Sequence, residues 1–316
     1  MAATKEKERP AAQRQPEPPQ KKSGSMSLSA RKTLVGLSFI TPNFIGFFIL
    51  IFIPVLFTFW LCFNRWDGFN PMEFAGLDNF KYIFGDKVFR EAVVKTLIFT
   101  AFSVVITMFF SLGLAVLINQ KLKGIAIFRT AIFFPYVASV VAVAAVWQML
   151  FQKDMGLINE VLKFFGVVDL PGWFASTKWA LPGVIIVNIW KNMGYYMIIY
   201  LAALQDVPTS LIEAGMIDGA TAWQRFWKIK WPLLGNATFF VVMMLTINSF
   251  KSFDLIYVLT EGGPGTATTL LSQYIYNQSF VSWDYGRASA AAMVLFAVVA
   301  VITLVQFRLE KKFTND

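Results

Sequence analysis

The chain has 316 residues, of which 56% are hydrophobic and only 15% are charged, whereas soluble domains carry about 25% charged residues. This composition excludes an ordinary soluble protein and indicates an integral membrane protein. The chain has no histidine and therefore lacks the commonest metal ligand and the commonest general base. Its one cysteine, Cys62, rules out an intrachain disulfide and a multi-cysteine metal site. Its net charge of +9 comes partly from eight basic residues before residue 33. We attribute this charge to membrane orientation and not to nucleic acid binding.

Residues 1–31 are rich in Lys, Arg, Gln, Pro and Ser and contain few large apolar side chains. Such a segment buries too little surface to offset the entropy lost on ordering. We expect a disordered cytoplasmic tail. The polar lead is too long, and the apolar segment after it too extended, for a cleavable signal peptide with its apolar core of about 7–15 residues.

Six apolar segments follow, each long enough to cross a hydrocarbon core of about 30 Å, which takes about 20 helical residues. They predict an all-α, polytopic membrane protein with six transmembrane helices. Pro42, Pro54, Pro135 and Pro182 fall inside these segments and are expected to mark helix ends or kinks. The predicted spans are 34–63, 92–119, 130–151, 180–204, 233–259 and 288–307.

Lys and Arg are distributed unevenly between the two sides of these spans. The N-terminal tail, the loop at 119–129, the central polar insertion and the C-terminus together carry 17, against 9 in the alternate loops. The positive-inside rule therefore places both termini and the insertion in the cytoplasm. The outer loops hold several aromatic residues, which serve as interfacial anchors or contact an external partner: Trp66, Tyr82, Trp173, Trp179, Tyr274 and Trp283.

The polar insertion at 205–235 is predicted to fold as two short helices and a turn. Capping-box patterns, Ser210 with Glu213 and Thr221 with Gln224, predict where the two helices begin. Asp218-Gly219 supplies the break between them, and Pro232 is expected to end the unit. On the second helix, aromatic residues at helical spacing form one face, with Arg225 and Lys228 off it: Trp223, Phe226 and Trp227.

The spacing of this insertion resembles the EAA loop of membrane permease subunits of bacterial binding-protein-dependent ABC importers. Glu213-Ala214-Gly215 is followed after three residues by Gly219, and after nine more by Ile229 and Trp231-Pro232. Gly215 stands where the family has alanine, and Trp231 where it has leucine. The segments 128–135, 147–151 and 259–264 resemble the sugar-permease branch, of maltose and oligosaccharide type. The resemblance covers roughly residues 33–310.

Several expectations follow from the resemblance. It implies a type I ABC importer permease domain over 32–316, which seats its loop in an ATPase subunit and receives force there. The implied coupling residues are Glu213, Ala214, Gly215, Asp218, Gly219, Ala220 and Phe226. A structural alternative stays open, in which Glu213 only caps its own helix and the aromatic residues only pack against the inner ends of the bundle.

The chain has no Gly-x4-Gly-Lys-Ser/Thr phosphate loop, so it is not expected to bind a nucleotide on backbone amides. We predict no catalytic residue, no metal site and no cofactor on this chain, with ATP and Mg on the partner ATPase subunits. The expected partners are a second homologous permease in a heterodimer, two ATPase subunits, an extracytoplasmic solute-binding protein and membrane lipid. The expected location is the bacterial cytoplasmic membrane.

A second set of polar residues lies inside the predicted fourth and fifth spans, where ionisable groups cost about 3 kcal/mol each and therefore usually face a cavity or a partner. Counting 1.5 Å per residue places the two groups at similar depth. Either they line a solute path, or Lys191 and Asp254 form a buried ion pair and the asparagines join helices. The candidates are Asn188, Lys191, Asn192, Tyr195, Tyr196, Asn248, Lys251 and Asp254, with Ser252 beside them.

A cavity of amides, hydroxyls and aromatic faces suits a polyhydroxylated solute. We therefore expect ATP-driven import of an oligosaccharide or disaccharide by alternating access. A glycerol-3-phosphate permease of the same family is an alternative. An ion-coupled secondary carrier is a further one, although such carriers need no capped cytoplasmic hairpin. A membrane-embedded enzyme would need a catalytic cluster, and none is visible in the sequence.

Overall fold

The computed structural model describes residues 28–120 and 123–314. The chain divides into two compact units between Pro54 and Val55, which we describe separately. Of the predicted tail, residues 1–31, residues 1–27 lie outside the described residues, and residues 28–31 are the first residues of helix α1. There the Thr33 hydroxyl donates to the Ser29 carbonyl at 3.0 Å, a bond within the helix.

The first unit is an apolar helical segment made of α1 (Leu28–Phe47), the π turn η1 (Phe48–Phe52) and the start of α2 (Ile53–Leu61). The π turn ends two residues before Pro54, whose ring lacks the amide hydrogen that would bond to the Leu50 carbonyl. Proline is a usual cause of such irregularities. Together these helices give a stretch of 30 residues, Lys32–Leu61, apolar enough to cross a membrane. The first predicted span is confirmed as a helix.

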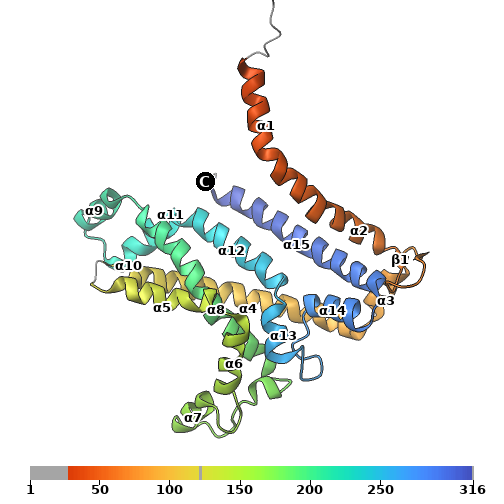
Figure 1. Cartoon of the computed structure of the whole chain (residues 1–316). Coiled ribbons are helices and arrows are strands. Elements are labelled where there is room, and N and C mark those ends of the chain that lie inside the picture. The colour runs from red at the N-terminus through yellow and green to blue at the C-terminus, as the bar shows by residue number, and fades with distance from the viewer. Residues whose placement is uncertain (1–27, 121–122, 315–316) are drawn as a thin grey trace, which may run out of the picture. The chain divides into compact units, whose positions relative to one another are not determined.

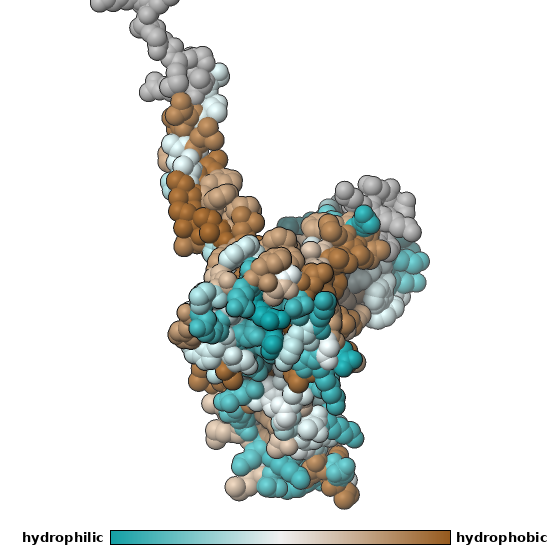
Figure 2. Space-filling view, turned by 90° about the vertical axis from the view of Figure 1, so that its right-hand side faces the viewer, coloured by the Kyte–Doolittle hydropathy of each residue, from teal (hydrophilic) through white to brown (hydrophobic). Residues whose placement is uncertain are grey.

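The second unit opens with a short antiparallel hairpin and two helices. Asn64 pairs with Phe74 and Arg65 with Glu73. The Asp86 carboxylate then caps the next long helix by accepting the Val88 amide at 2.9 Å, the usual role of aspartate at a helix N-terminus. The elements are β1 (Asn64–Arg65), β2 (Glu73–Phe74), α3 (Asp78–Gly85) and α4 (Lys87–Ile118). Polar residues gather on the face that carries this hairpin (Figure 2).

The middle of the second unit contains a sharply bent helix pair and then a long straight helix. The elements are α5 (Ile125–Val137), α6 (Val140–Leu150), α7 (Leu157–Phe164), the 3-10 turn η2 (Trp173–Ala175) and α8 (Ala180–Gln205). α5 and α6 meet at 99°. The third predicted span, 130–151, is therefore a bent pair of helices, in the segment where Pro135 was expected to mark a helix end or a kink. The bend lies at Ala138 and Ser139, which are extended, and Pro135 lies inside α5.

The polar insertion and the remaining helices complete the unit. The elements are α9 (Thr209–Ile217), α10 (Ala222–Arg225), the π turn η3 (Phe226–Lys230), α11 (Trp231–Leu233), α12 (Gly235–Phe250), α13 (Asp254–Thr260), α14 (Leu271–Tyr276), the π turn η4 (Asn277–Val281) and α15 (Tyr285–Thr314). In Figure 1, α12 and α15 lie side by side.

The fifth predicted span, 233–259, is also not one helix. α12 ends at Phe250, and residues 251–253 form a turn before α13. At the inner end, Pro232 does not end the insertion, because it starts α11, and the chain bends by 68° after Leu233. Proline is tolerated there because the first helical residues need no amide partner. The described residues thus contain four helices that could cross a membrane by length and composition, or six spans if each bent pair counts as one.

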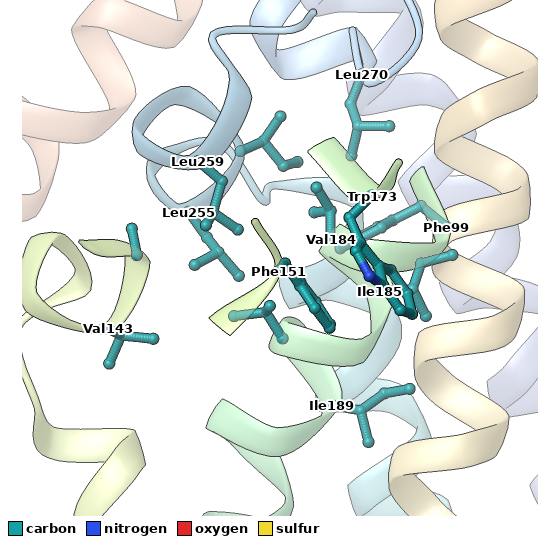
Figure 3. Close-up of a cluster of buried hydrophobic side chains, with 13 residues drawn as sticks. Phe99, Val143, Phe151, Trp173, Val184, Ile185, Ile189, Leu255, Leu259 and Leu270 are labelled. Carbon is teal, nitrogen blue, oxygen red and sulfur yellow. The ribbon is translucent and has the colours of Figure 1, made fainter. Parts of the chain in front are cut away.

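Three buried clusters hold the second unit together, with α8 packed against both α4 and α5. Figure 3 shows the first cluster, in which Phe151 stacks on Trp173 with ring centres 4.2 Å apart. The buried side chain of Asn159 on α7 links the segments around it. It accepts the Trp173 indole hydrogen at 2.7 Å and donates to the carbonyls of Lys153 and Pro171 at 2.8 and 3.1 Å. These contacts hold α7 against η2 and against the loops on either side of it.

Candidate functional site

A polar cavity of about 330 Å³ lies within the second unit, where α5, α8, α12 and α13 meet. It contains every predicted solute-path residue except Tyr195. The polar residues of the fourth and fifth segments are therefore brought together in one cavity. Its lining consists of Tyr136, Asn188, Lys191, Asn192, Tyr196, Leu245, Asn248, Ser249, Lys251, Ser252, Asp254 and Leu255.

Amide side chains form hydrogen bonds on both sides of the cavity. On α8, Asn192 Nδ2 donates to the carbonyl of Asn188 at 2.8 Å and to its side-chain oxygen at 3.0 Å. Across the cavity, Asn248 Nδ2 on α12 donates to the Tyr196 hydroxyl at 3.2 Å. Because Asn248 and Asn192 are not fully buried, each keeps polar atoms that face the cavity.

The charged residues of the cavity are not arranged as a buried ion pair. Lys191 Nζ donates to the backbone carbonyl of Tyr136 at 3.1 Å, and in the described part of the chain no carboxylate lies within ion-pair distance of it. The Lys191–Asp254 pair that the sequence left open is therefore wrong. Lys251 and Asp254 lie in and after the turn that ends α12, so they are not inside a continuous span.

Tyr136 is a cavity residue that the sequence analysis did not identify. Its ring stacks on Tyr195, with centres 4.5 Å apart and planes at 16°. Tyr195 thus supports Tyr136 from behind instead of lining the cavity. Tyr136 is one aromatic residue among many in an apolar stretch. Only the bend that follows it places its ring beside the polar residues of α8.

The lining offers amide, hydroxyl and ammonium groups together with a tyrosine face. Such groups donate and accept hydrogen bonds from hydroxyls, and a ring packs against the apolar face of a sugar. The volume is at the lower end of the range of about 300–1,000 Å³ for small-molecule sites. Among the described residues, no group of three Asp, Glu or Cys side chains is placed to hold a metal ion.

The helical hairpin at residues 209–233 is the second candidate site. The predicted capping box at its second helix is confirmed. Gln224 N donates to Thr221 Oγ1 at 3.3 Å, and Thr221 N donates to Gln224 Oε1 at 2.8 Å. Gly219 has the positive φ of +74° that the turn after Asp218 requires. The box predicted at Ser210 is wrong, because α9 starts at Thr209, directly after Pro208, and Ser210 lies inside its first turn.

Glu213 and Ala214 are exposed on α9, and Glu213 has no hydrogen-bond or ion-pair partner among the described residues. The Glu213 carboxylate therefore does not cap α9. Gly215 is buried, and a Cβ there would lie 2.8 Å from the end of the Ile229 side chain. Gly215 thus lets α9 pack closely on the second helix. The Arg225 guanidinium donates to the Ala220 carbonyl and closes the turn.

The aromatic residues of the hairpin divide into two kinds. Phe226 packs against the inner buried cluster of the bundle, as the structural alternative expected. Trp223 remains 71% exposed, so bundle packing does not account for it. The Trp223 and Phe226 rings both contact Trp227, with centres 5.5 and 5.2 Å away. The exposed edge of the hairpin therefore presents Trp223 near the turn.

The hairpin and the cavity are joined by two helices. α8 runs from its outer end through Asn188 and Asn192 to Gln205, shortly before α9, and α12 runs from the hairpin to Asn248. At 1.5 Å per residue, Asn192 lies about 20 Å from the inner end of α8. Each of the two helices thus runs between the hairpin and one polar wall of the cavity.

Comparison with known proteins identifies the chain. The family described as "Binding-protein-dependent transport system inner membrane component" matches residues 108–315. The probable ABC transporter permease protein YesP of Bacillus subtilis (strain 168) is 37% identical over 287 residues, covering 89% of this chain and 92% of that protein. The trehalose/maltose transport system permease protein MalF of Thermococcus litoralis is 31% identical, covering 92% and 97%.

A solved structure agrees with these relatives. One chain of a bacterial ABC transporter involved in the import of the acidic polysaccharide alginate superposes with a TM-score of 0.79 at 25% identity, covering 90% of this chain and 97% of that one. The family predicted from the residue spacing of the hairpin is confirmed, and with it the transport role in place of an enzymatic one. The chain belongs to the inner membrane components of binding-protein-dependent transport systems, the permease subunits of ABC transporters.

Proposed function

We propose that this chain is one of two homologous permease subunits of an ABC importer that carries a carbohydrate across the bacterial cytoplasmic membrane by alternating access. The observation that carries the proposal is the polar cavity, joined by α8 and α12 to a hairpin with an exposed carboxylate at Glu213. The composition of the cavity suits hydroxyl-rich solutes. Related permeases named for maltose, starch degradation products and lactose support a carbohydrate.

The partners follow from the same features. Two ATPase subunits, which bind ATP and Mg, receive the hairpin, and a solute-binding protein delivers the sugar to the outer face. The alginate transporter has been solved with a pentasaccharide-bound periplasmic protein, which supports a binding-protein partner. The excess of Lys and Arg in the hairpin and both termini supports their placement in the cytoplasm. Closure of the ATPases moves the hairpin, and α8 and α12 transmit the movement to the cavity.

Reconstitution of the complex tests the proposal. The chain is purified with its co-purifying ATPase, and uptake and ATP hydrolysis are measured with binding protein and a panel of maltose, trehalose, lactose, an alginate oligosaccharide and sn-glycerol 3-phosphate. Glu213→Ala is expected to lower uptake and solute-stimulated hydrolysis at least roughly tenfold, since a charged contact at a protein interface is lost. Ser210→Ala, in the same helix but not among the predicted coupling residues, is the control.

Amide exchange over 209–217 shows whether α9 still forms in the Glu213 variant, which separates loss of coupling from loss of structure. The proposal is wrong if no ATPase co-purifies, or if the Glu213 variant transports and hydrolyses ATP like the wild type. Uptake that follows an ion gradient without ATP would identify a secondary carrier instead.

A further inference from the structure

The broken helix beside the cavity ends within the bundle. α5 stops at Val137 and α6 starts at Val140 after a bend of 99°. The last carbonyls of a helix have no partner within it, and unpaired backbone groups are costly inside a membrane. The Phe134 carbonyl accepts the Ala138 amide at 3.1 Å. The Tyr136 carbonyl is satisfied from a different helix, by the Lys191 ammonium of α8 at 3.1 Å.

Lys191 contacts Tyr136 in two ways. Its Nζ reaches the carbonyl, and it also lies 5.6 Å from the centre of the Tyr136 ring. The C-terminus of a helix carries partial negative charge, and an aromatic face attracts a cation. The charge of Asp254 acts on Lys191 from across the cavity, but no carboxylate among the described residues lies within ion-pair distance of it. The end of α5 is therefore the group that the ammonium contacts directly.

Two neighbours of Lys191 on the same face of α8 hold the same turn of α5. Gly194 brings the two backbones into contact, because a Cβ there would lie 2.1 Å from the Ile132 carbonyl oxygen. Tyr195 stacks on the Tyr136 ring at 4.5 Å. Residues three and four apart share a helix face, so Lys191, Gly194 and Tyr195 act together on the last turns of α5.

We propose that Lys191 is a positioning residue, which holds the bent end of α5 and thereby fixes the Tyr136 ring on the cavity wall. This inference rests on the proposed function, because Tyr136 then forms part of the solute path. Lys191 acts on the solute through Tyr136 and does not bind it directly. Removing the ammonium releases the Tyr136 carbonyl and loosens the turn before the bend, while the outer surface for the binding protein stays as it is.

Hydrogen exchange on the complete transporter in lipid nanodiscs tests the anchoring without any solute. Lys191→Met is expected to speed amide exchange over 136–139 roughly tenfold, as expected for losing a hydrogen bond from a charged group. Lys191→Arg keeps a charged donor and stays within about threefold of the wild type. Lys178→Met is the matched control. Lys178 also lies near an aromatic ring, with its Nζ 5.7 Å from the centre of Trp179, but it forms no hydrogen bond to the C-terminal end of α5. Equal exchange in Lys191→Met and wild type overturns the proposal.

Uptake of whichever panel solute the wild type transports tests the role. Lys191→Met and Tyr136→Ala are each expected to lower the maximal rate roughly tenfold, with no change in the half-saturating concentration of loaded binding protein. The double variant should be no slower than Tyr136→Ala alone, because the two side chains act as one unit. Lys191→Arg should restore most of the rate.

Multiplied losses in the double variant, about a hundredfold, would mean that Lys191 contacts the solute independently, and they overturn the positioning role. A wild type that transports none of the panel sugars counts against the proposed function. In that case the exchange experiment still decides whether Lys191 anchors α5, so the two failures remain distinguishable.

Discussion

Gly194→Ala is expected to destabilise the bundle by forcing two helix backbones apart. A Cβ at Gly194 would lie 2.1 Å from the Ile132 carbonyl oxygen and 2.9 Å from the Cα of Phe133. Both are backbone atoms, so no side-chain rotation relieves the clash. Ordinary contact starts at 3.4 Å; α5 and α8 must therefore separate by about 1 Å, a shift that well-packed interiors resist.

The magnitude follows from two opposing terms. Overpacking of a buried contact costs about 1–3 kcal/mol, and the backbone clash places Gly194→Ala at the upper end. Alanine in place of a helical glycine returns about 1 kcal/mol. The net loss is about 2 kcal/mol, and the Tyr136 ring moves with α5. Uptake should therefore fall together with stability.

Thermal unfolding of the reconstituted complex, followed by tryptophan fluorescence, measures this loss. The matched control is Gly113→Ala on α4, because nothing lies within 4 Å of a Cβ built there, and it gains up to about 1 kcal/mol from helix propensity. The two variants should differ clearly in unfolding temperature and in uptake. If Gly194→Ala unfolds at the same temperature as Gly113→Ala and transports normally, the close backbone contact does not exist.

Three further substitutions test local parts of the structure. Thr221→Ala removes a formed cap and should cost about 1 kcal/mol, seen as faster amide exchange over 222–230, whereas Ser210→Ala should change stability by only a few tenths of that. Asn159→Ala should lower the free energy of unfolding by about 2–3 kcal/mol, because it leaves the Trp173 indole hydrogen and two carbonyls unpaired. Lys95→Met should speed amide exchange in the loop 261–270 severalfold, since Lys95 Nζ donates to the carbonyl of residue 266 at 2.6 Å. The ion pair that Lys95 also forms with Glu91 is partly exposed, so its loss should add little to this effect.

The sequence predicted helices accurately where hydropathy alone decides them. The fourth span was predicted at 180–204, and α8 runs over Ala180–Gln205. Pro182 does not interrupt this helix, because it lies in the first turn, where proline is tolerated. The third segment is equally apolar but bends by 99°. Its bend depends on tertiary contacts, the Lys191 ammonium on the Tyr136 carbonyl and the close approach at Gly194. No local pattern encodes these contacts.

The sequence predicted which residues line the cavity only where their position along a helix could be counted. Counting residues from the inner ends of two segments placed Asn192 and Asn248 at one level, and both line the cavity. Depth along the fourth and fifth segments gives no information on Tyr136, because this residue lies in the third segment, directly before the bend at 138–139. The predicted ion pair between Lys191 and Asp254 is wrong for the same reason that the fifth predicted span is not one helix. α12 ends at Phe250, so Asp254 follows a turn instead of continuing that helix.

The positions of the helix breaks relate the hairpin to the cavity. α8 is an unbroken helix over Ala180–Gln205, whereas the bends lie at 138–139, at 234 and at 251–253. Under the proposed function, α8 acts as the rigid element between the ATPase contact and the polar wall, and the bends absorb the change in angle. Hinges are usually a few residues at element ends. The residues that anchor a bend, Lys191 at α5 above all, therefore govern how hairpin movement changes the cavity.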